Sequence, residues 1–164
     1  MWWPEQRFNE VFQNELPEVA TSELEYGPQG IGMWGDMHGQ RGSSTRMEIA
    51  GLINAMLRAT AFHVGIDSAS TIAKAKKLQQ EAVNRCRAQG GRWWLWRNPC
   101  RKPWGLQVDG DLWTIYWQGL MARGPEIIRI SKVKGHASVQ DVESGAVKLR
   151  DKQGNDKSDV YAVR

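Results

Sequence analysis

Two short strand-like segments, set among helical patterns, constrain the fold of this chain most. Residues 62–66 alternate apolar and polar side chains, and residues 127–133 form the clearest strand pattern in the sequence. Around them, apolar residues recur at the three- and four-residue spacing that is typical of amphipathic helices. Helices that alternate with strands predict an α/β fold, in which functional side chains gather at the carboxyl ends of strands.

The helices expected around these strands have recognisable start and stop signals. They are predicted over residues 45–60, over residues 70–87, from a cap at residues 109–111 to the break at 124–125, and from about residue 155 onward. Thr45 and Glu48 have the spacing of a capping box. The first helix carries an apolar stripe that includes Ile53, and the third carries apolar residues that include Ile115. The predicted buried side of the second helix consists of Ile72, Ala75, Leu78, Ala82, Val83 and Cys86. Residues 27–30 predict a turn, residues 31–40 a strand, and residues 138–154 a polar loop.

The length of 164 residues favours a single domain over residues 1–164, with residues 1–30 poorly defined and residues 88–111 a basic, aromatic insertion. Lys plus Arg number 22 against 18 acidic residues, and this mild excess fits a polyanionic partner or an ordinary globular protein. The two cysteines lack CxxC spacing, which favours a reducing compartment. Neither a membrane-spanning run nor a signal-peptide pattern is visible, so we expect an intracellular protein, nuclear or cytoplasmic.

Tryptophan is unusually frequent, with nine residues, and five of them fall within residues 93–113. Indoles in a basic segment stack on bases or sugars, or they pack the segment onto the core, and the second interpretation is slightly favoured. The helix over residues 70–87 carries Lys74, Lys76, Lys77, Arg85 and Arg87. A face of this kind is usually solvated, but its scarcity of acids also fits a phosphate-facing surface.

Three separated acids, Glu48, Asp67 and Asp159, stand where a metal site could draw its ligands. Hard divalent cations bind oxygen ligands, and carboxylates from several elements can hold them. Each acid also has a simpler explanation: a capping box for Glu48, an exposed loop for Asp67, and a helix N-terminus for Asp159 and its neighbour Asp156. Their combination and chain order favour the metal site.

Four motifs, in this order along the chain, resemble those of the ribonuclease H family. They are Ser-Ser-Thr-Arg-Met-Glu-Ile-Ala-Gly-Leu at 43–52, Gly-Ile-Asp-Ser at 65–68, Lys-Val-Lys-Gly-His-Ala at 132–137 and Gly-Asn-Asp-Lys-Ser-Asp at 154–159. The resemblance covers about residues 30–164, and retroelement-encoded domains are the most similar type. It implies a five-stranded mixed sheet with helices on both faces.

The resemblance also implies an activity, which is hydrolysis of the RNA strand of an RNA–DNA hybrid with two Mg²⁺ ions, or Mn²⁺. Glu48, Asp67 and Asp159 match the metal-binding carboxylates, and His136 matches a mobile histidine that assists proton transfer or product release. The positions that match contacts to nucleic acid are Ser44, Thr45, Arg46 and Ser68. The expected partners are a hybrid duplex or another nucleic acid, without a membrane, within a larger retroelement polyprotein.

The chain departs from the family at its first motif, a strand whose Asp bridges both metal ions. Nothing before Glu48 matches it, and residues 1–4 resemble the middle or end of the second strand instead. The first, central strand would therefore lie upstream of Met1, and we expect weak or no hydrolysis from three acids. The alternatives are a non-catalytic nucleic-acid-binding module and an interaction domain whose indoles bind a protein.

Overall fold

The computed structural model describes residues 2–3, 24–27, 30–33, 43–56, 61–88 and 97–162. The chain forms two compact units, each of which is described by itself. We call Arg41–Lys132 the helical unit, and Met1–Gln40 with Val133–Arg164 the terminal unit. The expectation of a single domain stays a prediction.

The helical unit contains a two-stranded parallel sheet. Strand β4 (Phe62–Ile66) pairs with β5 (Ile128–Lys132), with Phe62 opposite Ile128 and Ile66 opposite Lys132. Both strands lie where the alternating patterns predict them. Alternation gives the sheet two unlike faces, because successive side chains point to opposite sides. Phe62, Ile66, Ile128 and Ile130 are buried, whereas His63, Gly65 and Arg129 are exposed.

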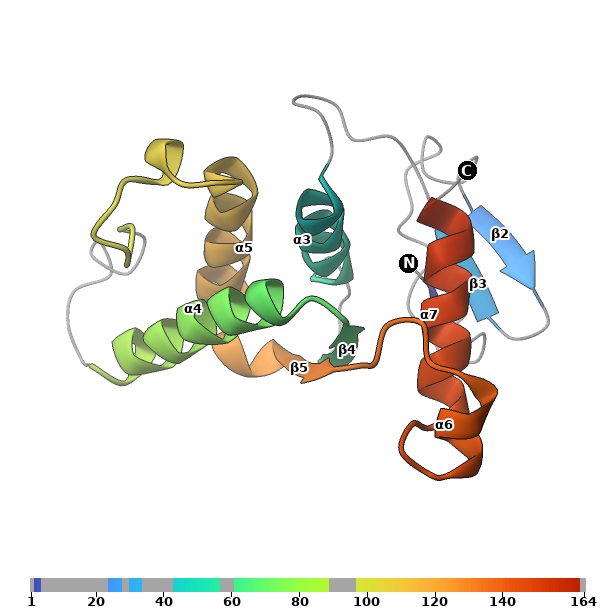
Figure 1. Ribbon diagram of the computed structural model, residues 1–164. Helices are drawn as coiled ribbons and strands as arrows, with labels where there is room; N and C mark the ends of the chain where they lie inside the picture. The colour runs from blue at the N-terminus through green and yellow to red at the C-terminus, as the bar shows by residue number, and fades with distance from the viewer. Residues whose placement is uncertain are drawn as a thin grey trace. The chain divides into compact units, whose positions relative to one another are not determined.

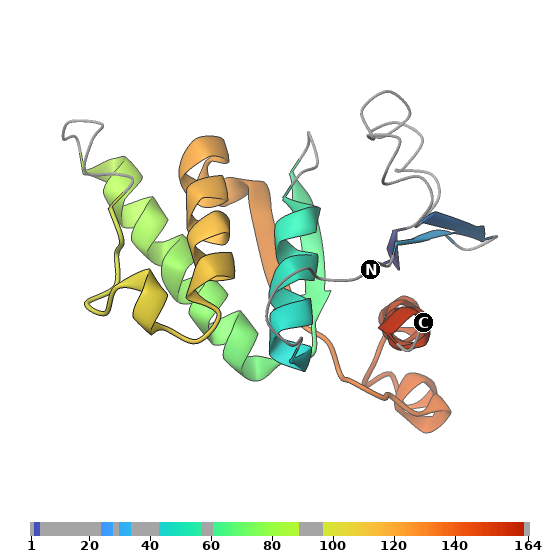
Figure 2. The same cartoon turned by 90° about the horizontal axis from the view of Figure 1, so that it is seen from above.

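Three helices pack together beside this sheet. They are α3 (Ser44–Ala55), α4 (Ala69–Arg87) and α5 (Gly110–Arg123), and α3 and α5 run side by side in both views (Figure 1 and Figure 2). Two 3₁₀ turns flank α5, at Trp104–Leu106 and Pro125–Ile127. The extent of α4 confirms the predicted end at Arg87, and the start and end of α5 agree with the predicted cap and break. Residues 57–60 of the predicted first helix lie outside the described residues.

The core of the helical unit is built around α5. Tyr116, Trp117 and Leu120 are almost completely buried, and Trp113 meets Tyr116 edge to face with ring centroids 5.8 Å apart. Two cations of α4 lie over these indoles, Lys74 over Trp113 and Arg85 over Trp117. Trp113 and Trp117 therefore pack into the core, but both belong to α5. In the Trp-rich loop, Trp104 is half-buried, and the interpretation that this loop packs onto the core through its indoles stays a prediction. Trp93, Trp94 and Trp96 lie outside the described residues.

Some predicted core positions are wrong. Ile115 is 48% exposed and Cys86 is exposed, although both lie on the predicted apolar stripes, and Ile53 is only half-buried. The width of a helix's buried face depends on which neighbours pack against it, and the sequence pattern does not give those neighbours. Both cysteines, Cys86 and Cys100, are free thiols.

The terminal unit combines a small antiparallel sheet with two helices. Strands β1 (Trp2–Trp3), β3 (Gly30–Met33) and β2 (Leu24–Gly27) pair in that order, with Gly27 opposite Gly30. Residues 28 and 29 of the predicted turn lie outside the described residues. Helix α7 (Leu149–Ala162) packs on β1 and β3 (Figure 1). Residues 34–40 of the predicted strand lie outside the described residues.

The polar loop predicted for residues 138–154 is wrong. It contains α6 (Val139–Glu143), with a capping box between Ser138 and Asp141, and the first turns of α7. Helix α7 begins six residues before the predicted start near residue 155. The prediction missed this start because the helix has no apolar stripe that would mark it in the sequence. Pairs of polar side chains four residues apart, Lys152 with Asp156 and Asn155 with Asp159, stabilise it instead.

The described residues thus form a mixed α/β structure, rich in helix, with a small parallel sheet. Among the helices that the structure describes, none is both long and apolar enough to cross a membrane.

We predict that Gly110→Ala destabilises the helical unit. A Cβ atom at Gly110 would lie 1.8 Å from the backbone oxygen of Trp104, which must then move. Overpacking of this kind costs about 1–3 kcal/mol, so thermal unfolding should show a lower Tm. Gly105→Ala is the matched control, because nothing lies within 4 Å of its added Cβ. A Tm equally lowered in both variants would contradict the prediction.

Candidate active site

Glu48 lies in the second turn of α3. The N-cap of α3 is Ser43, whose hydroxyl accepts a hydrogen bond from the Arg46 N–H at 3.1 Å. The predicted capping box between Thr45 and Glu48 is therefore wrong, since the helix begins two residues earlier than that spacing requires. The carboxyl of Glu48 is thus left to make tertiary contacts.

Asp67 is the first residue after β4, and Ser68 follows it as the N-cap of α4. The carboxyl end of a strand and the start of a helix meet at this point, where backbone and side-chain polar groups face the same space. The Ser68 hydroxyl accepts a hydrogen bond from the Thr71 N–H at 3.3 Å. Asp67 and Ser68 are both half-buried, so neither is an ordinary exposed loop residue.

Thr71 connects these elements, and sequence reasoning missed it. Its side chain is almost completely buried, and its hydroxyl donates to Glu48 Oε2 at 2.9 Å. The same hydroxyl oxygen lies 3.0 Å from the Ser68 hydroxyl. The spacing of Ser68 and Thr71, an N-cap residue and the third residue of the helix, was the signal that could have found it.

The carboxyls of Glu48 and Asp67 form one interacting pair. Burial raises the pKa of Glu48, and a hydrogen bond and charge repulsion from Asp67 raise it further, while hydrogen bonds from Thr71 and Ser68 oppose the rise. A neighbouring negative charge disfavours the ionised form of Glu48. The sequence predicted both residues for one site, and the structure brings these two together.

A second pair forms in the terminal unit. His136 follows β5 in the left-handed backbone region, with φ of 49°, and its Nδ1 lies 3.3 Å from Asp159 Oδ2. Asn155 donates a hydrogen bond to the same oxygen at 3.2 Å. Asp159 and Asp156 lie in the second half of α7, so a role as helix N-terminal acids does not explain them. Asp156 pairs with Lys152 along the helix surface.

The other predicted contacts lie at the start of α3. Ser44 is exposed and Thr45 is half-buried, and their contact with nucleic acid stays a prediction. Arg46 is only 6% exposed, and its guanidinium binds the carboxylates of Asp109 and Asp111 at the start of α5. These ion pairs raise the pKa of Arg46 and lower that of Asp111 to about 2. The structure therefore gives Arg46 a role inside the protein.

Glu48 and Asp67 have the chemistry that a divalent cation requires. They offer carboxylate oxygens beside the Ser68 hydroxyl, and a cation would relieve the repulsion that raises the pKa of Glu48. Within neither unit do three or more His, Cys, Asp or Glu side chains of the described residues form a group that could hold a metal ion. Glu48 and Asp67 belong to the helical unit, whereas His136 and Asp159 belong to the terminal unit.

Comparison with known proteins gave no relative. No protein-family model matches the sequence, and neither a curated protein nor a solved structure matches it. The functional argument therefore depends on the residues themselves.

We predict that Glu48→Gln stabilises the protein near pH 7 and has little effect near pH 4. The pKa of Glu48 in the folded state is raised above its ordinary value of 4.5. Between those values the folded state holds a proton that the unfolded state has lost, so stability falls as the pH rises through this range. Glutamine does not titrate, so the variant keeps the stability that the wild type loses as the pH rises.

The measurement is Tm at several pH values between 4 and 7 for wild type, Glu48→Gln and the control Glu126→Gln, which removes an exposed carboxylate from the same unit. A Tm difference between Glu48→Gln and wild type that does not grow with pH would contradict the coupling of Glu48 to Asp67.

We also predict that Arg46→Lys lowers the Tm, because an ammonium cannot reproduce the two-pronged contact of a guanidinium with Asp109 and Asp111. Asp111 has its pKa lowered to about 2, so this contribution is present above pH 4 and is lost as the pH falls toward 2. The difference in Tm from wild type should shrink across that range. Arg129→Lys, an exposed site, is the control. A variant with normal Tm and weaker nucleic-acid binding would instead assign Arg46 to the ligand.

Proposed function

We propose that this protein is a ribonuclease H-type enzyme that hydrolyses the RNA strand of an RNA–DNA hybrid, with Mg²⁺ or Mn²⁺ as cofactor. The observation that carries the proposal is the pairing of Glu48 with Asp67, two predicted metal ligands from different elements, at the carboxyl end of β4. The finer fold, a ribonuclease H-like mixed sheet with helices on both faces, is part of the same proposal.

The residues around Glu48 support a role in holding a cation. Thr71 donates to Glu48 Oε2 and fixes the orientation of the carboxylate, and Ser68 contributes a further hydroxyl. A supporting shell of this kind orients a ligand and tunes its affinity. A bound divalent ion would stabilise negative charge on the phosphodiester and lower the pKa of water. Glu48 and Asp67 would bind it, and the resemblance of the sequence motifs assigns the same kind of role to Asp159.

His136 is assigned to proton transfer at the phosphodiester. Its imidazole is exposed, and its Nδ1 faces Asp159, which favours the tautomer that carries the proton on Nδ1 and leaves Nε2 as the acceptor. The left-handed backbone at His136 turns the chain just after β5 and presents the ring to solvent. In this proposal, Asn155 orients Asp159 and, through it, the ring.

One observation favours a second candidate, a non-catalytic module that binds nucleic acid. Among the described residues, the helical unit brings together two site acids, Glu48 and Asp67, and the terminal unit brings together one acid and one histidine, Asp159 and His136. Neither pair has enough ligands for two metal ions. Exposed Lys76 and Lys77 on α4 would then contact phosphates without a metal.

The test is cleavage of a labelled RNA–DNA hybrid in Mg²⁺ or Mn²⁺. We expect slow, metal-dependent cutting of the RNA strand only, reduced at least about 100-fold by Asp67→Asn, since even partners outside the ligand set cost 10–100-fold. Asp159→Asn should act similarly, whereas Asp156→Asn, which changes a surface pair on the same helix, should not.

Folding of every variant is checked by circular dichroism. If the folded wild type does not cut but binds the hybrid with a steep salt dependence, the protein is a binding module and the proposed activity is wrong.

A further inference from the structure

The loop that carries His136 is closed at both ends by one carboxylate, that of Asp141 in α6. Lys134 lies two residues before the histidine, and its ammonium donates to Asp141 Oδ1 at 2.7 Å. Ser138 lies two residues after it, and its backbone N–H and hydroxyl donate to Asp141 Oδ2 at 2.8 and 2.9 Å. Asp141 therefore binds the residues on both sides of His136, and all of them belong to the terminal unit.

The start of α6 explains only half of this arrangement. The hydrogen bonds that Ser138 and Asp141 exchange form a capping box, which begins the helix. A capping box needs no partner for the second carboxylate oxygen of Asp141. That oxygen binds Lys134, seven residues earlier in the chain, and this contact joins the two ends of the loop.

The carboxylate of Asp141 is charged at neutral pH, so that all of these contacts are present there. The ammonium of Lys134 and the two donors of Ser138 lower the pKa of Asp141 to about 2. An exposed ion pair contributes little when both side chains must be ordered to form it. Here Ser138 already holds the carboxylate in place, and only the lysine side chain remains to be ordered.

The backbone of His136 depends on support from its surroundings. Its φ of 49° lies in the left-handed region, where a residue with a Cβ atom is strained. Strained conformations persist where the surrounding structure fixes them. The side chain of His136 is 87% exposed, so packing of the ring does not supply that support. Buried Ala137 fixes the chain just after the histidine, and the bond from Lys134 to Asp141 fixes it just before.

The direction of the imidazole follows from this backbone conformation. With residue 136 in the left-handed region, Nδ1 of the ring lies 3.3 Å from Asp159 Oδ2. Most residues have negative φ values, and a return of His136 to that region would redirect its Cβ atom and its ring. The contact between His136 and Asp159 therefore requires that both ends of the loop are held.

We propose that Asp141 is a positioning residue for His136, and that its contacts with Lys134 and Ser138 hold the loop so that the imidazole faces Asp159. Asp141 acts through the loop and does not touch the substrate. The part that the ring plays in hydrolysis rests on the proposed function, whereas the orientation of the ring by Asp141 does not.

Two simpler roles make different predictions. If Asp141 only caps α6, then loss of the Ser138 hydroxyl should disturb His136 as much as loss of the Asp141 carboxylate does. If Lys134 only contacts phosphates of a nucleic acid, then its loss should weaken binding and leave the ring of His136 unchanged.

The experiment observes the imidazole of His136 by NMR in the full chain, with ¹⁵N-labelled histidine, at about pH 8, where the ring is ordinarily neutral. The two ring nitrogens then report which of them carries the proton, and His136→Gln identifies the signals among the three histidines. We expect the wild type to hold the proton mainly on Nδ1, which faces Asp159. The ratio of this tautomer to the other should fall about fivefold in Asp141→Ala and in Lys134→Met, as loss of one hydrogen bond allows.

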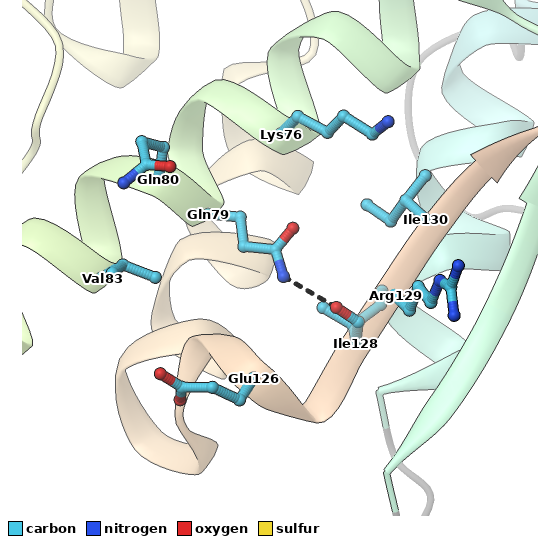
Figure 3. Close-up of a pocket in the computed structure, with 8 residues that line it drawn as sticks. All are labelled: Lys76, Gln79, Gln80, Val83, Glu126, Ile128, Arg129 and Ile130. Atoms are coloured by element: carbon cyan, nitrogen blue, oxygen red, sulfur yellow. Dashed lines mark hydrogen bonds between the residues drawn. The ribbon is translucent and has the colours of Figure 1, made fainter.

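Three control variants separate orientation of the ring from general effects. Lys134→Arg keeps a cation beside Asp141 and should keep the wild-type ratio. Ser138→Ala removes the capping hydroxyl but leaves the backbone N–H and Lys134 on Asp141, so the ratio should change less than about twofold. Lys76→Met removes an exposed lysine of α4 in the helical unit (Figure 3) and should leave the ratio unchanged.

Cleavage of the RNA–DNA hybrid provides a second measurement. Asp141→Ala and Lys134→Met should lower kcat at least about tenfold and leave KM nearly unchanged, because a misplaced proton-transfer group slows the chemical step and not binding. If the folded wild type does not cleave the hybrid, the proposed function is wrong, and the ring spectrum still tests the role of Asp141 by itself.

An unchanged tautomer ratio in Asp141→Ala or in Lys134→Met would overturn the proposal, and so would a wild-type ring with its proton mainly on Nε2. Equal losses in Asp141→Ala and Ser138→Ala, without a loss in Lys134→Met, would assign Asp141 to helix capping alone. A raised KM in Lys134→Met with an unchanged ratio would assign Lys134 to the hybrid. Circular dichroism checks the folding of each variant. If Asp141→Ala does not fold, Lys134→Met, a change at a side chain that is 56% exposed, decides the outcome.

Discussion

The contact of Arg46 with Asp109 and Asp111 determines how the helical unit is assembled. It joins the first turn of α3 to the first turn of α5, although 63 residues separate Arg46 from Asp109 along the chain. An α-helix turns by 100° per residue, so Glu48, two residues after Arg46, faces almost the opposite way. Once Arg46 is bound to α5, the carboxyl of Glu48 is directed away from α5, toward the start of α4 and Asp67.

The Glu48–Asp67 pair illustrates a conflict between stability and function. Burial and the neighbouring carboxyl raise the pKa of Glu48. Deprotonation of Glu48 therefore lowers the free energy of unfolding of the protein. Hydrogen bonds from Thr71 and Ser68 stabilise the charged carboxylate and reduce this destabilisation, but the pKa of Glu48 is still raised. Destabilised pairs of this kind are concentrated at functional sites, where a ligand supplies the missing stabilisation. In the proposed function, that ligand is a divalent cation, whose charge would compensate the two carboxylates.

Much of the local structure was predictable because it depends on neighbours in sequence. The alternation in residues 62–66 and 127–133 predicted β4 and β5, and an apolar stripe predicted α4 up to Arg87. The errors have different causes. Ile115 stays exposed because no element covers that side of α5, in the part of the chain that the structure describes, and α7 is helical without an apolar stripe because polar pairs stabilise it.

The sequence by itself determined the mixed α/β character and most of the strands and helices of the helical unit, since periodicity follows from backbone geometry. It also predicted Glu48 and Asp67 for one site, from their combination and order along the chain. Only the tertiary structure decided three further points. It placed Thr71 between Glu48 and Ser68, it turned Arg46 from a predicted ligand contact into an internal ion pair, and it joined Gln79 of α4 to the backbone oxygens of Pro125 and Ile128. Each of these depends on which residues distant in sequence come within hydrogen-bonding distance, and no local pattern records that information.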